Sequence, residues 1–401
     1  MSNQQAAEKK NHRQLSQELD FVMSSEEAPG MPFYLPNGMI VRNALESYWR
    51  DAHRKAGYEE IRTPVMMKQE MWETSGHWDH YHDNMYFSEV DGQNYALKPM
   101  NCPGAMLIFN HKRRSYRELP VRYAELGLVH RHELSGSLNG LLRVRAFTQD
   151  DAHLFVREDQ IVSEISGVLD LIDDMYSKFG FSYEVELSTR PEEFMGDPAL
   201  WDRAEDSLKD VLGQRGMAYT LNEGDGAFYG PKIDFHILDS LGRSWQCGTV
   251  QLDFQMPGKF GCEYIGEDNA PHRPIIIHRA IFGSIERFLA ILLEHYEGAF
   301  PFWMAPEQIR ILPIAAPHLE YAYELKRRLV EQGYRADVDD RDEKFGYKVR
   351  EAAKGKVPFS FVVGDREVEE GKVAVRKRHE GDLGQMPWEA ALGLLEEVSA
   401  Q

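Results

Sequence analysis

Polar side chains occupy one face of a strand that the sequence predicts near the middle of the chain. Counting in twos from Phe147 places Phe147, Gln149, Asp151 and His153 on that face, because successive strand side chains point to opposite sides. Strand faces inside a domain are normally apolar, so this combination indicates the wall of a wet, charged pocket.

Charged residues flank the turn of the same hairpin, which runs from 128 to 155 through a Gly/Ser/Asn-rich turn. They are Arg131, Glu133, Arg143 and Arg145. Guanidinium groups match phosphate oxygens in charge and in bidentate geometry. The hairpin therefore predicts a pocket for a phosphate-bearing ligand.

Composition excludes several classes of protein. The net charge of −19 over 401 residues argues against nonspecific binding to DNA or RNA, although a specific RNA partner remains compatible with it. No apolar run is long enough for a membrane span, and the polar N-terminus lacks a secretory signal. Three scattered cysteines do not make a disulfide framework. We expect a cytoplasmic protein with neither membrane nor DNA as a partner.

The elements that position these residues follow from hydrophobic spacing and turn signals. We expect helices over roughly the first 25 residues, over 37–57 and over 280–297. The predicted strands are 92–99, 121–133, 143–155, 182–188, 231–238 and 243–254. Because strands and helices do not alternate as βαβ units, the pattern favours an α+β domain with an antiparallel sheet over 1–303.

The pattern changes near Ile309, where strands begin to alternate with helices. Predicted helices at 318–332, 346–353 and 387–398 belong to a small α/β domain over 304–401. Basic clusters at 326–328 and 375–378 are compatible with an anionic partner and equally with a solvated mixed-charge face.

Three segments together resemble the signature motifs of class II aminoacyl-tRNA synthetases. These are RTP with Pro64, the hairpin strings 130–133 and 145–153, and IHRAIFGSIERF at 277–288. The strings at 100–104, 226–234 and 245–254 are similar to the threonyl enzymes of that class, and the resemblance runs from about residue 11 to 400. It implies a homodimer with the Pro64 region in its interface, and ATP with Mg²⁺, L-threonine and tRNA(Thr) as substrates.

The resemblance also implies how ATP is held. Arg131 contacts the α-phosphate and Arg143 the distal phosphates. Glu133 accepts from the adenine amino group, Phe147 stacks on the adenine, and Arg287 lies against the adenine or the γ-phosphate. These roles make physical sense, since adenine needs a π-face and displacement at phosphorus needs fixed cations.

A zinc site is implied for Cys102, His153 and His278, whose spacing alone would favour packing residues. The resemblance predicts one Zn²⁺ per subunit, with open positions for the amino nitrogen and hydroxyl of threonine. A required hydroxyl ligand rejects valine, whereas serine lacks only a methyl group and is rejected weakly. Asp151 would accept the hydroxyl's hydrogen bond.

The remaining pocket residues come from the same resemblance. Substrate contacts are implied for Met100, Gln149, Tyr229 and Gln251, an ATP-side role for Gln246 and Thr249, and catalytic roles for Lys232 and His77. His77 is the candidate to assist proton removal from the terminal ribose. Gln246 has the opposite strand parity to Thr249, so its placement needs a bulge or an edge approach. The histidine-rich segment 76–83 matches a substrate-side loop, and we predict no second metal site there.

The C-terminal part resembles the anticodon-binding domain of this subgroup. Glu367 and Arg376 match residues that read anticodon bases, and Arg341 with Asp342 fall where the family often has Arg-Asn. Aspartate in place of asparagine removes two donors and adds a charge that RNA repels, which puts base reading by Asp342 in doubt.

We therefore predict a threonine–tRNA ligase core. Two alternatives stay open: a threonine-activating enzyme that serves a non-tRNA acceptor, and a catalytically silent tRNA-sensing protein. Bacterial members of the family usually carry two further N-terminal domains, one of which hydrolyses mischarged seryl-tRNA. Neither precedes the core in this sequence, so we do not expect editing by that route.

Overall fold

The computed structural model describes residues 9–239 and 242–399, which form two compact units. The large unit contains 24–32 and the described part of 48–291. The small unit contains 9–23, 33–47 and 292–399. Each unit is described separately below, and the boundary at 303/304 stays a prediction.

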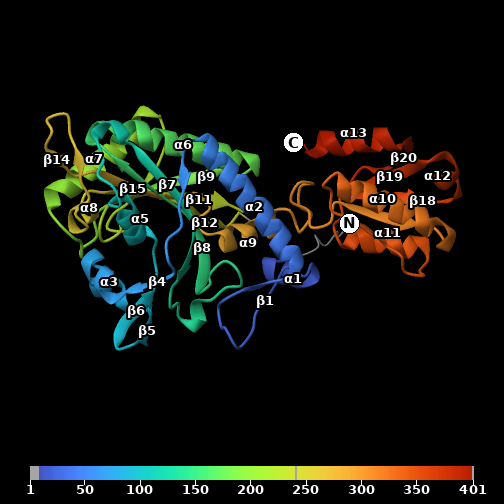
Figure 1. Ribbon diagram of the computed structural model, residues 1–401, viewed down its shortest axis with the longest axis horizontal. Helices are drawn as coiled ribbons and strands as arrows, with labels where there is room; N and C mark the ends of the chain where they lie inside the picture. Colours follow the sequence, from blue (N-terminus) through green and yellow to red (C-terminus); the bar gives the residue numbers. More distant parts are fainter. Residues whose placement is uncertain (1–8, 240–241, 400–401) are drawn as a thin grey trace, which may run out of the picture. The chain divides into compact units, whose positions relative to one another are not determined.

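An eight-stranded sheet forms the centre of the large unit (Figure 1). In spatial order its strands are β10 (Thr220–Asn222), β9 (Tyr183–Ser188), β11 (Lys232–Leu238), β12 (Ser244–Asp253), β15 (Ile275–Ala280), β8 (Ala146–Val156), β7 (Val121–His130) and β3 (Glu59–Glu60). Neighbours are antiparallel except at the two ends, where β10 is parallel to β9 and β3 is parallel to β7. The predicted antiparallel sheet is confirmed.

Amphipathic helices cover this sheet. The longest is α6 (Ile161–Lys178), whose buried residues recur at helical spacing: Ile161, Ile165, Val168, Leu169 and Ile172. The other helices of this unit are α3 (Gln69–Ser75), α4 (His77–Tyr81), α5 (Cys102–Phe109), α7 (Pro198–Gln214) and α8 (Met256–Lys259). Two helices cross the division between the units, α2 (Pro36–Lys55) and α9 (Ile285–His295).

Short strands complete the large unit. A three-stranded sheet joins β4 (Met66–Lys68), β6 (Gln93–Leu97) and β5 (Tyr86–Val90). A separate pair joins β13 (Tyr264–Ile265) and β14 (Pro271–His272). The six strands predicted for this part of the chain are all present, most with slightly shorter ends.

Two predicted helices are wrong in extent. The segment predicted as a helix from 280 begins instead as the end of β15, and α9 starts only at Ile285. Gly283 has φ of +78°, which interrupts any helix, and Ser284 Oγ then accepts a hydrogen bond from Arg287 N at 3.0 Å to cap the new one.

The polar N-terminal helix is also shorter than predicted. Within the described residues α1 spans only His12–Glu18, and residues 1–8 lie outside them. Asp20 has a positive φ of 52° that ends the helical path. The chain then forms β1 (Val22–Met23), which pairs with β2 (Phe33–Tyr34).

The small unit contains a five-stranded sheet in the order β17 (Ala336–Val338), β16 (Ile309–Pro313), β18 (Phe359–Val363), β19 (Lys372–Lys377) and β20 (Gly381–Pro387). β17, β16 and β18 are parallel to one another, whereas β19 is antiparallel to both of its neighbours, β18 and β20. Its helices are α10 (Leu319–Glu331), α11 (Phe345–Lys354), α12 (Asp365–Glu370) and α13 (Trp388–Ser399). The predicted α/β pattern is confirmed, with α12 and β20 as additions.

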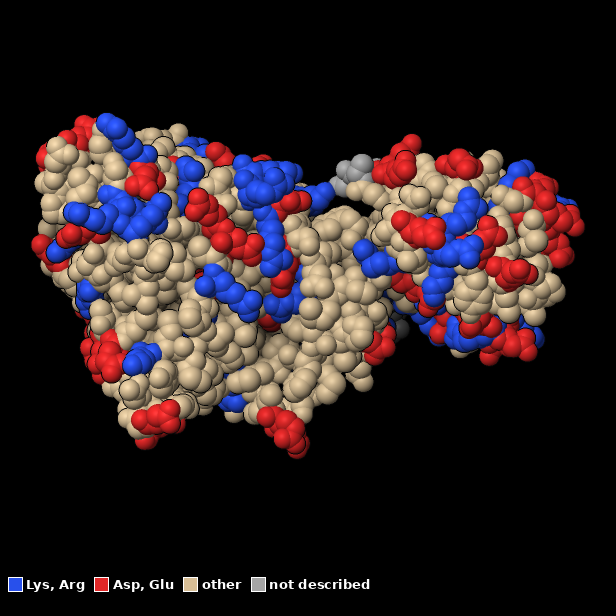
Figure 2. Space-filling model, in the orientation of Figure 1, with Lys and Arg blue, Asp and Glu red and all other residues tan. Residues whose placement is uncertain are grey.

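Surface charge is mixed rather than segregated. Figure 2 shows acidic and basic side chains interspersed on the visible face of each unit. Among the described residues, no helix is both long and apolar enough to cross a bilayer.

Candidate functional site

A cavity of about 660 Å³ lies over the centre of the large sheet. Its walls come from β8, β12 and β15, from the end of β7, and from the segments that precede α5 and α9. The predicted pocket residues line it, except His77 and Arg145: Met100, Cys102, Arg131, Glu133, Arg143, Phe147, Gln149, Asp151, His153, Tyr229, Lys232, Gln246, Thr249, Gln251, His278 and Arg287. Segments almost two hundred residues apart in sequence thus share one cavity.

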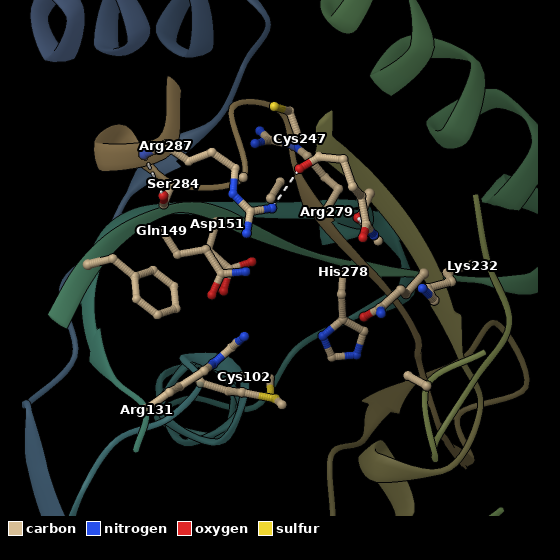
Figure 3. Close-up of a pocket in the computed structure, with 18 of the residues that line it drawn as sticks. Cys102, Arg131, Gln149, Asp151, Lys232, Cys247, His278, Arg279, Ser284 and Arg287 are labelled. Atoms are coloured by element: carbon tan, nitrogen blue, oxygen red, sulfur yellow. Dashed lines mark hydrogen bonds between the residues drawn. The ribbon is translucent and has the colours of Figure 1, made fainter. Parts of the chain in front are cut away.

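Strand pairing brings two histidines of the cavity together. His153 on β8 is the register partner of His278 on β15, and their ring centroids are 5.0 Å apart. Cys102, the first residue of α5, completes a buried group whose ligand atoms all lie within 4.8 Å of one another. Figure 3 shows Cys102 and His278 converging on this part of the cavity. Buried sulfur and imidazole donors this close together fit a zinc ion.

The electrostatics of this group also fit a metal. Burial, followed by the carboxylates of Asp151 and Asp253, raises the pKa of the Cys102 thiol well above its usual range. A thiolate in this place therefore needs a cation beside it. Burial lowers the pKa of His153 well below its usual range, which keeps the imidazole neutral as a metal ligand must be.

Asp253 supports this group and was not predicted. Its Oδ2 lies 3.0 Å from His278 Nε2, which leaves the other ring nitrogen available to a metal. Its Oδ1 accepts from the backbone N–H groups of Gln255 and Met256, so the carboxylate is held rigidly. Asp253 has the same strand parity as Thr249 and Gln251, and that alternation was the signal that could have identified it.

Asp151 lies beside the metal-ligand group. Asn101 Nδ2 donates to Asp151 Oδ2 at 3.0 Å, and burial raises the pKa of Asp151 to about 6. Asn101 reaches it across Gly127, where a Cβ atom would lie 2.3 Å from the Asn101 side chain. Glycine at this position of β7 is therefore required for the asparagine to support Asp151.

The predicted nucleotide contacts form pairs among themselves. The guanidinium carbon of Arg131 lies 5.1 Å from the centre of the Phe147 ring. Arg143 donates to Glu133 Oε2 through both Nε, at 3.0 Å, and Nη2, at 2.9 Å.

Arg145 does not line the cavity, although its position in the hairpin suggested a phosphate contact. Its guanidinium donates to the backbone oxygen of Glu133, to Pro29 O and to Ser135 Oγ. Arg145 lies just before β8. The register of β7 and β8, continued by one residue, would place it opposite Arg131 on the face of Phe147, but its guanidinium turns to these oxygens and fixes the hairpin instead.

Arg287 enters the cavity opposite Arg131 (Figure 3). It donates to two backbone carbonyls, Leu142 O at 3.1 Å through Nε and Gln246 O at 2.8 Å through Nη1. The turn before α9 lies tightly against β12, because a Cβ on Gly283 would be 2.7 Å from Cys247 O. Both the glycine and the arginine therefore depend on the backbone of β12.

Asp150, on the reverse face of β8, anchors the same turn and was not predicted. Its Oδ2 accepts from the N–H groups of Ile281 and Phe282, each at 2.9 Å. Burial raises the pKa of Asp150 to about 6, although these hydrogen bonds act against the rise. Asp150 thus fixes the turn before α9 from the reverse face of β8, whereas Asp151 lines the cavity on the other face.

A hydrogen-bonded pair lies beside the Cys-His-His group, where the Tyr229 and His278 ring centroids are 5.1 Å apart. Tyr229 Oη donates to Gln251 Oε1 at 2.6 Å. A bulge in β12 places Gln246 on the face of Thr249, because Phe235 pairs with Gly248 while His236 pairs with Gln246. Of the two arrangements that the parity of Gln246 left open, a bulge or an edge approach, the structure has the bulge.

His77 is fully buried and packs beside the cavity rather than lining it. Its Nδ1 is hydrogen-bonded to Ser75 Oγ at 2.7 Å, and its Nε2 lies 3.1 Å from Met100 Sδ. Burial, followed by the charge of Arg131, lowers its pKa to about 3. The predicted role in proton removal stays a prediction. No metal-capable group among the described residues includes a histidine of 76–83.

The predicted anticodon residues lie in two parts of the small unit. Arg341 follows β17, where it is bidentate to Asp339 with contacts of 2.8 and 2.6 Å, and Asp342 is exposed next to it. Glu367 follows β18 at the same edge of the sheet. Arg376 pairs with Ser360 near the opposite end of β18, and so lies farther along the sheet.

Comparisons with known proteins agree with these features. Residues 86–296 match the tRNA synthetase class II core domain (G, H, P, S and T), and 308–398 match an anticodon binding domain. The chain is 59% identical over 382 residues to a threonine–tRNA ligase of Carboxydothermus hydrogenoformans and 60% identical over 380 residues to one of Acetivibrio thermocellus. These matches cover 95% of this chain and 60% of each relative, so the chain spans about three fifths of their length.

A solved structure agrees with the chain over almost its whole length. The RNA binding domain of threonyl-tRNA synthetase from Cryptosporidium parvum Iowa II matches with a TM-score of 0.94 and 39% identity. The match covers 97% of this chain and 98% of that one. Together with the class II core match, it shows that this chain belongs to the threonyl-tRNA synthetase family of class II aminoacyl-tRNA synthetases.

Proposed function

We propose that this chain activates L-threonine with ATP and transfers it to the 3′ end of tRNA(Thr). The observation that carries the proposal is that one cavity is lined both by a buried Cys-His-His group and by Arg131 and Arg287. This combination supports an amino-acid-selecting end and a phosphate-binding end in the same cavity. Activation needs both, since the carboxylate oxygen must attack the α-phosphorus in line as pyrophosphate leaves.

Cys102, His153 and His278 would hold the zinc ion. When bound, zinc supplies a Lewis-acidic position that both the amino group and the hydroxyl of threonine satisfy. Asp151, held by Asn101, would accept the hydrogen bond of that hydroxyl. Valine keeps the amino group but has no hydroxyl, so it can make neither the second contact with zinc nor the hydrogen bond to Asp151.

Arg131 and Arg287 would neutralise the charge that develops as pyrophosphate leaves, with ATP entering as its Mg²⁺ complex. Phe147 offers an apolar face to adenine, and Glu133, released from Arg143, accepts from its amino group. Tyr229 and Gln251 would bound the amino acid, with Met100 and Gln149 beside them. In the second step the ribose hydroxyl at the 3′ end of the tRNA attacks the carbonyl carbon of the adenylate, and AMP leaves. Lys232 would donate a hydrogen bond to an oxygen that carries negative charge in this step.

The remaining partners are proposed from family membership. A homodimer would form through the Pro64 region. The small unit would read the anticodon through Glu367 and Arg376, with Arg341 and Asp342 nearby. Charging of bulk tRNA with radiolabelled threonine tests the function, and strong ATP–pyrophosphate exchange without tRNA charging would instead favour a non-tRNA acceptor. Loss of both activities would favour the silent, tRNA-sensing alternative.

Replacing Asp253 with asparagine is expected to weaken zinc binding by about 10- to 100-fold, because the His278 ring loses its charged hydrogen-bond partner. Competition with a fluorescent chelator measures the affinity. Asp268→Asn is the matched control, since Asp268 also contacts a histidine, His272, but at an exposed position. Equal zinc affinity in wild type and Asp253→Asn would contradict the assigned support.

Serine is expected to be activated by this cavity far better than valine. Serine carries both groups that the zinc position requires and lacks one methyl group, a difference typically worth about 10- to 200-fold. Valine leaves polar groups unpaired, which typically costs about 10⁴-fold or more. ATP–pyrophosphate exchange with each amino acid gives the ratios of kcat/KM. Comparable rates with valine and serine would rule out selection through the hydroxyl.

A further inference from the structure

Asp234 has no assigned role, yet its carboxylate is the meeting point of several cavity residues. It lies on β11 between β9 and β12, and only 1% of its surface is exposed. Oδ1 accepts from Gln246 Nε2 at 2.6 Å and from Thr249 Oγ1 at 2.8 Å. Oδ2 accepts from Lys232 Nζ at 2.8 Å and from Ser188 Oγ at 3.2 Å.

The two donors to Oδ1 lie on either side of the β12 bulge. Cys247 is the extra residue of that bulge, and without it Gln246 would point to the reverse face of the sheet. By holding Gln246 and Thr249 at once, the carboxylate fixes the bulged backbone between them. Asp234 itself does not line the cavity, so it acts on whatever depends on that backbone.

The positions of Arg287 and of the turn before α9 depend on the bulged backbone of β12. The carbonyl of Gln246 accepts from Arg287 Nη1 at 2.8 Å, and the carbonyl of Cys247 packs against Gly283. A path of direct contacts therefore runs from Asp234 through the Gln246 side chain to the Gln246 carbonyl, and from there to the guanidinium of Arg287. Each step is a hydrogen bond or a covalent link.

Oδ2 of Asp234 restrains Lys232, another residue that lines the cavity. Lys232 Nζ lies between Asp234 and the more exposed Asp225, at 2.8 and 3.2 Å. Glu186, Asp225 and Asp234 bring their carboxylates within 4.8 Å of one another, and the Lys232 ammonium bonds to two of them. The positive charge of Lys232 therefore explains why these carboxylates lie close together, and no metal ion is needed there.

We propose that Asp234 is a positioning residue of the activation site, which sets Arg287 through the β12 bulge and restrains Lys232 at the same time. The proposal rests on the proposed function for its effect on threonine activation. Its effect on ATP affinity requires only that the cavity binds ATP. Asp234→Asn keeps the size of the side chain and one acceptor oxygen, while its amide group opposes the Lys232 ammonium. The bulge and the lysine are then held less firmly.

The test is a double-mutant cycle of Asp234→Asn with Arg287→Ala, read by ATP affinity in calorimetry and by threonine-dependent ATP–pyrophosphate exchange. Asp234→Asn alone is expected to lower kcat of exchange by about 10- to 100-fold, the usual effect of a small misplacement of a catalytic group. In the Arg287→Ala background it should lower exchange by less than about threefold, because Arg287 is already gone and Lys232 is assigned to the transfer step, which exchange does not measure. Zinc content should be unchanged.

Asp239→Asn is the matched control. Asp239 is a buried aspartate that follows β11 and accepts from Arg243 and from Trp245 Nε1, away from the cavity. It should leave ATP affinity unchanged even if it lowers the melting temperature. Loss of ATP affinity in this control would show that any weakening of the β11–β12 hairpin produces the effect, which would overturn the proposal.

Two other results would overturn the proposal. The first is wild-type exchange activity together with wild-type ATP affinity in Asp234→Asn. The second is a double variant whose loss equals the product of the two single-variant losses. Should Asp234→Asn not fold, Gln246→Ala gives the same cycle, because Gln246 is the link to Arg287. Failure of the proposed function is distinguishable, since a wild-type chain inactive toward threonine still reports the coupling through ATP affinity.

Discussion

Replacing Cys102 with alanine is expected to remove bound zinc and to lower threonine-dependent ATP–pyrophosphate exchange by at least about 100-fold. Loss of an outer partner of a metal ligand alone typically costs about 10- to 100-fold, and Cys102 is proposed as a direct ligand. It is also the one anionic ligand of the group, so its loss leaves two neutral imidazoles. Metal analysis of the purified protein and the exchange assay measure the two effects.

Cys262→Ala provides the matched control, because Cys262 is also a fully buried free cysteine and packs in the same apolar cluster. It should keep both zinc and exchange. Full exchange in Cys102→Ala would remove the metal from the proposed function, whereas equal losses in both variants would point to a packing defect.

The second large effect is expected from Arg287→Ala. Two backbone carbonyls hold this guanidinium in the cavity before any ligand arrives, so its charge needs no reorganisation when pyrophosphate leaves. Removing one such preorganised group typically lowers the rate by about 10²- to 10³-fold. We expect a loss of that size in kcat/KM for ATP, measured by exchange, with zinc content unchanged.

Arg117→Ala is the control for this prediction. Arg117 is an exposed arginine of the large unit that lies against the neighbouring Tyr116 ring and donates to its hydroxyl, and it should keep wild-type exchange. Arg287→Ala activity within about threefold of wild type would exclude the assigned role, since removing a preorganised charge at the reacting phosphates typically costs about 10²-fold or more.

The sequence predicted much of the sheet because strand alternation and turn residues are local signals. The face carrying Phe147, Gln149, Asp151 and His153 was read from parity alone, and all four side chains line the cavity. Element ends were less certain where one glycine decides them. Gly283 turns a run with helical spacing into the end of β15, a turn and α9.

The supporting carboxylates were not predicted, because nothing local distinguishes them. Asp253 and Asp234 acquire their significance from side chains that other strands bring near: His278 for the first, and Gln246 with Thr249 for the second. Asp150 likewise matters through the N–H groups of residues 281 and 282, more than 130 positions away. Such contacts depend on strand order and register.

By itself, then, the sequence determined which residues carry chemistry and which face of each strand they occupy. The family resemblance added their roles. Only the tertiary structure decided that Cys102, His153 and His278 converge, that Arg145 turns away while Arg287 enters, and that His77 lies buried beside Met100. The reason is physical. Alternation and turn chemistry act over a few residues, whereas the cavity is built by the pairing of β8, β12 and β15 and by one bulge, which the parity of Gln246 suggested only in combination with the family resemblance.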